Sequence, residues 1–426
     1  MKTGTLLKTV ISLIIGLSVI AGLYTITGCE KQNGGEPEDP IQIALNAPEQ
    51  ELAVRGKSFT FSLLTSVIES EEEDVNISIS PFSLNSALAM LMNGASGATK
   101  DSIGKAMGFD GFTASDVNNY FKKVREAVLK TDKSAKILIA NSIWYRQEAT
   151  PQTLFINLNK TFYNAEIKPL DFTDQESAGI INQWCSDNTN GLIDKVIETI
   201  KPEDFMYLIN ALYFKAPWQK GYEFDPENTA SGNFNLAGGG SAGVSMMKND
   251  FNVSYYSDQN LSMISIPYGN GAFAMHFFLP AQGKSCETIA NSLIDEVYLN
   301  KIISESAERK VSAYIPRFKF KYDIGLNNIL QSRGMSIAYD PLRADFTDSF
   351  KGVPLVVTDV KQFNYINVDE EGTEAAAVTS ITVGLTSMPQ TTEFRLDRPF
   401  LYAIRENTSG VILFAGRVGN PASEGK

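Results

Sequence analysis

Histidine and cysteine are scarce in this 426-residue chain, which has one histidine, His276, and three cysteines. A single imidazole excludes any metal or catalytic site that needs two histidines. Three cysteines exclude a small scaffold held together by several disulfides. Basic residues are also in the minority, with 37 Lys and Arg against 49 Asp and Glu, which gives a formal net charge of −12. Because phosphate binding needs a basic face, this balance argues against a nucleic-acid partner.

No motif indicates an enzyme, a metal or a cofactor. Residues 238–243 (GGGSAG) match both G-x-G-x-x-G and G-x-S-x-G, but either motif requires a helix directly after it. The following residues, VSMMKNDFNVSYY, do not form an amphipathic helix, so we predict a glycine-rich surface turn. His276 lies in an apolar run, where a packed histidine is commoner than a catalytic base paired with Ser241. We therefore expect no enzymatic activity, no bound metal and no cofactor.

An apolar run lies close to the N-terminus, and no later run is long and apolar enough to cross a bilayer. Lys2 and Lys8 precede the uncharged stretch from Val10 to Ile26, a pattern typical of a secretory signal. The stretch ends in residues 26–29 (ITGC), which resemble a bacterial lipobox. We expect cleavage to leave Cys29 as a lipid-bearing N-terminus; the alternative is a signal peptide that contains a cysteine by chance.

Residues 1–28 are thus predicted to be a lipoprotein signal peptide. Its removal takes away two lysines and no acids, so the mature net charge becomes 35 − 49, or −14. Residues 29–50 are polar and rich in Gly, Pro and acids, as expected of a flexible tether. We expect an exported protein, anchored by lipid to the bacterial outer membrane or cell surface. Cys185 and Cys286 are expected to be buried free thiols, although their spacing also permits pairing.

Helical and strand-like segments are mixed beyond the tether, without the alternation that a parallel α/β sheet requires. This predicts one α+β domain over residues 51–421, built mainly on antiparallel sheets. The helical patterns cover 58–70, a segment that starts at 81, and 177–186. The strand patterns cover 76–80, 137–145, 206–214, 261–268, 272–279, 311–320, 362–368 and, as a pair around a turn at 407–410, 401–418.

The segment from Asp369 to Thr392 differs from the rest of this acidic chain, because its last eighteen residues carry no charge. Every second residue from Thr373 onward is small at first (Thr373, Ala375 and Ala377), and the later residues of this series are apolar. Such alternation predicts a latent β-strand with one face suited to burial. The alternative is an ordinary edge strand followed by a polar loop, and the segment alone does not decide between them.

Four further segments follow one another along the chain: NISISPFSLNSALAMLMNGASGAT (76–99), YLINALYFKAPWQKGYEFDPENT (207–229), EEGTEAAAVT (370–379) and RPFLYAIRENTSGVILFAGRVGNP (398–421). In this order they resemble signatures of the serpin family. The resemblance covers nearly the whole mature chain. It implies an α+β serpin fold with three β-sheets, eight to nine helices and an exposed reactive-centre loop at about residues 370–392.

The resemblance also implies a mechanism. A target protease attacks the loop and forms a covalent 1:1 acyl complex, and the loop then inserts into the central sheet before deacylation. Insertion of this kind implies a metastable monomer that risks loop-to-sheet polymerisation. The residues matching the family's hinge are Glu370, Gly372, Thr373, Glu374, Ala375, Ala376, Ala377 and Thr379.

Residues that match the family's control of sheet opening are Ser80, Ser83, Asn210 and Trp218. A histidine is common at the place taken here by Gln362. Glutamine both donates and accepts hydrogen bonds, so the same lock is expected, but a histidine-based pH switch is in doubt.

The reactive bond is expected at Thr386-Ser387, the usual distance after Gly372, with Leu385-Thr386 next. Counting back from the C-terminal signature points to Met388-Pro389 instead, but a proline after the scissile residue usually blocks cleavage. No Lys or Arg lies between Gly372 and Arg395, so a trypsin-like pocket would find no partner. We expect elastase-like or subtilisin-like serine proteases as targets. A papain-like cysteine protease that recognises Leu385 is a further possibility. The alternative function is a non-inhibitory serpin that acts as a binding protein.

Overall fold

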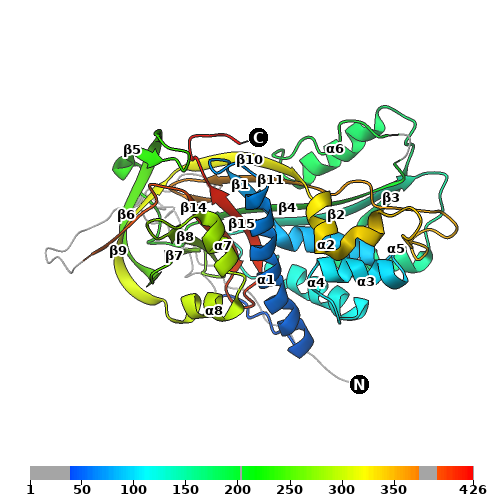
Figure 1. Cartoon of the computed structure of the whole chain (residues 1–426), viewed down its shortest axis with the longest axis horizontal. Coiled ribbons are helices and arrows are strands. Elements are labelled where there is room, and N and C mark those ends of the chain that lie inside the picture. Colours follow the sequence, from blue (N-terminus) through cyan, green and yellow to red (C-terminus); the bar gives the residue numbers. More distant parts are fainter. Residues whose placement is uncertain (1–38, 202–203, 374–390, 426) are drawn as a thin grey trace, which may run out of the picture. The chain divides into compact units, whose positions relative to one another are not determined.

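Nine α-helices and fifteen β-strands form within residues 39–201, 204–373 and 391–425, the parts of the chain that the computed structural model describes (Figure 1). Their order confirms the α+β class, because strands and helices do not alternate. The helices are α1 (Ala47–Glu69), α2 (Pro81–Met92), α3 (Gly97–Ala106), α4 (Ala114–Val128), α5 (Thr153–Tyr163), α6 (Ser177–Asn188), α7 (Cys286–Ser292), α8 (Glu296–Ser304) and α9 (Asn327–Leu330). Short helices cover Pro226–Asn228, Gln331–Met335 and Ser336–Tyr339.

A six-stranded sheet carries the candidate site. Its order is β10 (Phe318–Gly325), β11 (Lys361–Val368), β12 (Gly372–Thr373), β4 (Met206–Pro217), β2 (Lys136–Arg146) and β3 (Glu166–Leu170). Pairing is antiparallel except between β2 and β3. The mainly antiparallel architecture predicted from the sequence is therefore confirmed for this sheet.

Nine further strands form a second hydrogen-bonded network. They are β1 (Ile77–Ile79), β15 (Ile412–Val418), β14 (Phe400–Glu406), β8 (Phe273–Pro280), β7 (Leu261–Tyr268), β6 (Ser241–Ser257), β9 (Ala307–Pro316), β13 (Thr392–Arg395) and β5 (Ala230–Asn235). Only the last four residues of β6 pair with β7, whereas ten residues of β6 pair with β9. The network therefore consists of two parts joined at one corner. Counted separately, these parts and the six-stranded sheet make the three sheets expected.

Helix α1 begins earlier than the hydrophobic pattern predicts. The pattern starts at Ser58, but the helix starts at Ala47, where Asn46 and Glu49 form a capping box. The last four residues of the segment predicted to be a tether, 47–50, are thus helical. The helix therefore starts four residues before the predicted domain boundary, because the polar capping box lies ahead of the apolar residues that the pattern follows.

The single strand expected over 311–320 is two strands. The backbone N–H of Arg317 donates to the carbonyl oxygen of Ser245 at 2.9 Å, and here the chain leaves one sheet for the other. Pro316, which has no N–H, ends the first strand, β9. By contrast, the glycine-rich turn predicted at residues 238–243 is confirmed in part, since Gly239 and Gly240 have φ of 96° and 85° and lead into β6.

Helices cover both faces of the six-stranded sheet. Helix α2 packs against β4 and also against β15, so it lies between the two sheets. Helix α6 contacts β2 and β4 and lies on the opposite side of the sheet from α2 and α4 (Figure 1). Residues from Glu38 onward form one compact unit. Within the described ranges, no helix has the length and hydropathy to span a membrane.

Candidate functional site

The central feature of the six-stranded sheet is a gap between β11 and β4. In the described residues only the two-residue strand β12 lies between them: Thr373 pairs with Val368 of β11 and with Ala216 of β4. No pair among the described residues joins β4 directly to β11. Among the described residues, β12 thus stands between two long strands, β4 and β11, that have no direct pairing with each other.

Gly372 enters the sheet with a backbone conformation that only glycine adopts easily. Its φ is 148°, and a Cβ atom at this position would lie 2.2 Å from the carbonyl oxygen of Ala216. Any other residue would therefore push β12 away from β4. The hinge assignment of Gly372, made from a motif, has a steric reason in this contact.

Thr373 is buried at the head of the gap, with 4% of its surface exposed. Its Oγ1 lies 2.6 Å from the hydroxyl of Tyr268, within hydrogen-bond distance. Tyr268 in turn stacks on Trp218, with ring centroids 4.5 Å apart and planes at 11°. Trp218 binds the turn before β12, because its indole N–H donates to the carbonyl of Asp369 at 3.0 Å and its backbone N–H donates to Glu371 at 2.8 Å.

Glu370 holds the same turn by charge. Its carboxylate is buried and accepts hydrogen bonds from Arg317 Nε at 2.7 and 2.8 Å and from Thr229 Oγ1 at 2.5 Å. Burial alone would raise the pKa of Glu370, but the bonds from Arg317 and Thr229 leave its pKa below the ordinary value. Burial and the neighbouring negative charges raise the pKa of Asp369 and of Glu371. The turn before β12 therefore places three acidic residues, at positions 369–371, close to a single arginine, Arg317.

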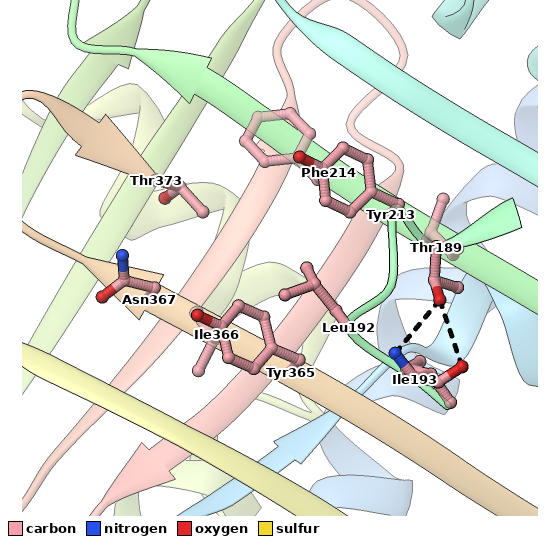
Figure 2. Close-up of a pocket in the computed structure, with 10 residues that line it drawn as sticks. Thr189, Leu192, Ile193, Tyr213, Phe214, Tyr365, Ile366, Asn367 and Thr373 are labelled. Carbon is pink, nitrogen blue, oxygen red and sulfur yellow. Dashed lines mark hydrogen bonds between the residues drawn. The ribbon is translucent and has the colours of Figure 1, made fainter. Parts of the chain in front are cut away.

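A small cavity of about 10 Å³ continues the gap below Thr373 (Figure 2). Its walls are the facing edges of β4 and β11, and part of the segment after α6 lies over it. The lining residues are Thr189, Leu192, Ile193, Leu212, Tyr213, Phe214, Tyr365, Ile366, Asn367 and Thr373.

Both edges of the gap are bound to the start of α2. Gln362 of β11 accepts from the backbone N–H of Ser80 at 3.0 Å and donates to the carbonyl of Ser80 at 2.7 Å. On the other side, Ser83 Oγ donates to Asn210 Oδ1 of β4. Ser80 Oγ also donates to the carbonyl of Leu413 at 2.8 Å. One helix start thus ties together the two strands that would have to separate.

Comparison with known proteins identifies this arrangement. A family model described as "Serpin (serine protease inhibitor)" matches residues 55–421. The chain belongs to the serpin family. It is 30% identical to human antithrombin-III over 400 residues, which cover 90% of this chain and 85% of that protein. It is 28% identical to mouse leukocyte elastase inhibitor A over 383 residues, with 87% and 100% covered.

Two solved serpin structures are similar in fold. The native state of the thermophilic serpin tengpin has a TM-score of 0.80 at 29% identity, covering 90% of this chain and 97% of tengpin. A thyroxine complex of thyroxine-binding globulin has a TM-score of 0.79 at 26% identity, covering 88% and 100%. Members of the family are generally protease inhibitors rather than enzymes, which agrees with the absence of a catalytic motif.

The residues expected to control sheet opening in this serpin fall into two places. Ser80, Ser83, Asn210 and Gln362 come together at the start of α2, whereas Trp218 lies at the head of the gap beside the turn at Asp369. Gln362 makes a paired donor and acceptor contact, which supports the prediction that a glutamine can replace the family's histidine in the lock.

Several expected site residues lie outside the described residues. These are Glu374, Ala375, Ala376, Ala377 and Thr379 of the hinge, Leu385, Thr386 and Ser387 of the reactive bond, and Cys29. Conversely, the motifs did not single out Tyr268, Arg317 or Thr229, which contact the hinge from distant elements. Thr229 ends the signature segment 207–229 and Tyr268 ends a predicted strand, but neither pattern indicates a contact with the hinge.

The two thiols of the serpin domain are buried and unbridged. Cys185 and Cys286 are both free, and burial raises the pKa of each to about 12. A thiol with so high a pKa is almost entirely protonated near neutral pH, so neither is a reactive nucleophile. The expectation of two buried free thiols is confirmed.

His276 is a buried structural residue of this serpin. It lies in β8, whereas Ser241 is exposed at the start of β6. Within the described part of the chain, neither ring nitrogen of His276 has a hydrogen-bond partner. Burial, with a smaller effect of the positive charge on Arg405, lowers the pKa of His276 to about 3. A buried ring with so low a pKa is a weak base, and Ser241 is exposed on another strand, so the structure argues against the dyad that the glycine-rich motif raised.

We expect acidification to destabilise the serpin through His276. The unfolded chain binds a proton near the ordinary pKa of about 6.5, while the folded ring stays neutral until about pH 3. Because the folded pKa is the lower one, the unfolded state alone gains from protonation, and stability falls as the pH drops below about 6.5. The loss is about 2 kcal/mol at about pH 5.

The measurement is the unfolding free energy of wild type and His276→Leu at neutral pH and at about pH 5. The difference between the two proteins should change by the stated amount in favour of the variant. Parallel pH profiles would contradict the assignment.

Proposed function

We propose that this serpin is a suicide-substrate inhibitor of serine endopeptidases, which it traps as covalent 1:1 acyl complexes. The observation that carries the proposal is β12, which pairs with β11 on one side and with β4 on the other and so places the start of the loop inside the six-stranded sheet. The reactive loop follows Thr373 directly along the chain. Insertion would extend pairing of the kind that Gly372 and Thr373 make with β4 and β11.

The register of β12 supports the same conclusion. Each residue beyond Thr373 would pair with one residue further back on β4 and on β11. Ala375 would then lie between Phe214 and Ile366, whose side chains line the cavity. Side chains two apart share a face, so Ala375 would point to the same buried side as Thr373. A methyl group fits such a site, whereas a charged side chain would be buried without a partner.

Further along the same register, Thr379 would reach the level of Asn210 and Gln362. These are the two residues that tie β4 and β11 to Ser80 and Ser83. Full insertion must therefore separate the two edges at the α2 lock, where hydrogen bonds resist it. This resistance accounts for a metastable native state that opens only after the loop is cut.

The chemistry of trapping follows from the loop. The nucleophile of a target protease would attack the carbonyl carbon of Thr386, release the amino group of Ser387 with a proton, and keep Thr386 as an acyl ester. Insertion then carries the ester, with the protease, along the sheet before water can cleave it. The bond Leu385-Thr386 is the second choice.

The target class follows from the absence of Lys and Arg between Gly372 and Arg395. Elastase-like or subtilisin-like enzymes, which accept small or aliphatic residues, are the proposed targets. The similarity to leukocyte elastase inhibitor A supports this choice. Cross-inhibition of papain-like cysteine proteases would depend on their recognising the side chain of Leu385.

The proposed location is the bacterial outer membrane or cell surface. Lipid on Cys29 would anchor the chain, and the residues between Cys29 and the helix cap at Asn46 would serve as the tether. The inhibitor is proposed to act as a monomer there, with a risk of polymerisation.

A binding function without inhibition is the second candidate. It is favoured by the similarity to thyroxine-binding globulin, whose complex contains thyroxine. The hinge composition argues against it, because Thr373, Ala375 and Ala377 are all small and uncharged. The two candidates differ in one property: only an insertable loop makes the cleaved protein more stable.

The deciding experiment mixes the serpin domain with elastase and analyses the products under denaturing conditions. We expect a 1:1 complex that resists denaturant, and a large rise in unfolding temperature when the loop is cut by a protease that is not trapped. The matched control is serpin already cleaved in the loop, which should form no complex. Clean cleavage with full elastase activity remaining would refute inhibition, and an unchanged unfolding temperature would favour the binding protein.

A further inference from the structure

Strand β10 is the end strand of the six-stranded sheet, and among the described strands only β11 pairs with it along its length. The backbone N–H of Lys321 points away from β11, since it donates to the carbonyl of Glu424 at 3.1 Å. Residues two apart in a strand present their main-chain groups to the same side, so Lys319 and Asp323 face outward as well. The outer edge of β10 is thus a row of donors and acceptors on which another strand can pair.

The chain covers the middle of this edge with its own residues 422–425, which we call the covering segment. Gly425 forms a parallel bridge with Lys321, next to the bond from Lys321 to Glu424. Figure 1 shows this part of the chain beside β10. The serpin family model matches residues 55–421, so the covering segment lies beyond the region that the chain shares with that model.

The covering segment is held by contacts that fit it closely. Asn76, which is 2% exposed, donates through Nδ2 to the carbonyls of Asn420 at 2.8 Å and Ser423 at 3.1 Å. Its Oδ1 accepts from two main-chain N–H groups of the same turn at 2.9 and 3.0 Å. Gly425 has a left-handed φ of 92°, and a Cβ atom there would lie 1.9 Å from the carbonyl oxygen of Lys321. A buried clamp and a position that requires glycine thus set the segment against β10.

We propose that the outer edge of β10 is a docking surface for β10 of a second copy of this chain, and that the covering segment keeps this surface closed. The charge pattern favours this partner. If two copies pair antiparallel about Lys321, Lys319 of each copy lies opposite Asp323 of the other. Two pairs of opposite charge then flank one pair of like charge, and each Lys321 already has Asp194 at 3.5 Å. Pairing of this kind has two-fold symmetry, so it closes as a dimer.

The experiment uses the compact unit that begins at Glu38, shortens it to end at Pro421, and measures self-association by analytical ultracentrifugation. The shortened chain should dimerise with a dissociation constant at least about tenfold lower than that of the chain with residues 422–426, because uncovered main-chain groups form cross-strand hydrogen bonds. Gly425→Val in the longer chain should also promote the dimer, since its side chain would clash with Lys321. Glu424→Ala is the matched control: its contact with β10 is made by the main-chain carbonyl, so this variant should stay monomeric.

The charges on β10 provide a second test in the shortened chain. Asp323→Lys should weaken the dimer about five- to thirtyfold, because lysines would then face lysines, and adding Lys319→Asp should restore it. Both side chains are exposed, so neither change disturbs the core.

Cleavage in the reactive loop should leave this dimer intact, which separates it from polymers formed by loop insertion. A shortened chain that stays monomeric would overturn the docking surface, and so would a dimer that Asp323→Lys does not weaken. The inference is independent of the proposed function, which the elastase experiment tests separately.

Discussion

Thr373→Arg should convert this serpin from an inhibitor into a substrate. Thr373 is 4% exposed, paired to strands on both sides, and within 2.6 Å of the Tyr268 hydroxyl. An arginine here would have to be buried next to the stacked rings of Tyr268 and Trp218, which costs several kcal/mol. We expect the variant to avoid this cost by keeping position 373 out of the sheet, so that insertion must then overcome it. Each step of about 1.4 kcal/mol would slow insertion about tenfold, while deacylation of the protease is unaffected.

The measurement is the number of serpin molecules consumed per elastase molecule inactivated, which should rise about tenfold or more. Thr373→Ser is the matched control, because it keeps the hydroxyl near Tyr268 and adds no bulk; its ratio should stay within about twofold of wild type. An unfolding curve like that of wild type would exclude a folding defect. If Thr373→Arg still formed one complex per serpin consumed, insertion through this position would be refuted.

Glu370→Lys should open the head of the gap and make the protein polymerise on mild heating. The change replaces a buried carboxylate with a second cation beside Arg317 and removes the acceptor for Thr229. Breaking a buried ion pair costs about 3 to 5 kcal/mol, but Arg317 is nearly half exposed, so we expect about 2 to 3 kcal/mol here. Once β12 is released, the edges of β4 and β11 would become available to the loop of another molecule.

Size-exclusion chromatography after incubation below the wild-type unfolding temperature should show oligomers of Glu370→Lys while wild type stays monomeric. Glu370→Gln, which removes the charge and keeps the shape, should have an intermediate effect. The charge-swapped pair Glu370→Arg with Arg317→Glu should recover part of the lost stability, because opposite charges again face each other. A monomeric Glu370→Lys protein with wild-type stability would show that the ion pair does not hold the turn.

Local sequence was a good guide where a structure depends on neighbours along the chain. The two strands around residues 407–410 and the mixed α+β order were predicted and confirmed, and the turn predicted at residues 238–243 was confirmed in part. The start of α1 was missed because its capping box, Asn46 with Glu49, precedes the apolar face that the prediction followed. The division at Arg317 was missed because the run is apolar on both sides of the point where the chain changes sheets.

At the candidate site, too, the sequence identified residues but not the distant contacts that explain them. Gly372, Thr373 and Glu370 were named from a motif, but the reasons for them lie elsewhere in the chain. A Cβ at Gly372 would meet Ala216, and Glu370 needs Arg317, 53 residues away. Such partners leave no local pattern, since a pairing across sheets depends on the packing of whole elements.

By itself, the sequence determined the fold class, the four family signatures, the small residues of the hinge and the lack of a basic residue in the loop. Each of these is a property of side-chain size, charge or spacing along the chain. Only the tertiary structure decided that β12 lies between β4 and β11, that Ser80 and Ser83 tie both of these strands to α2, and that Leu192 lines the cavity between them. These features depend on which distant segments meet, and that is set by packing rather than by any local preference.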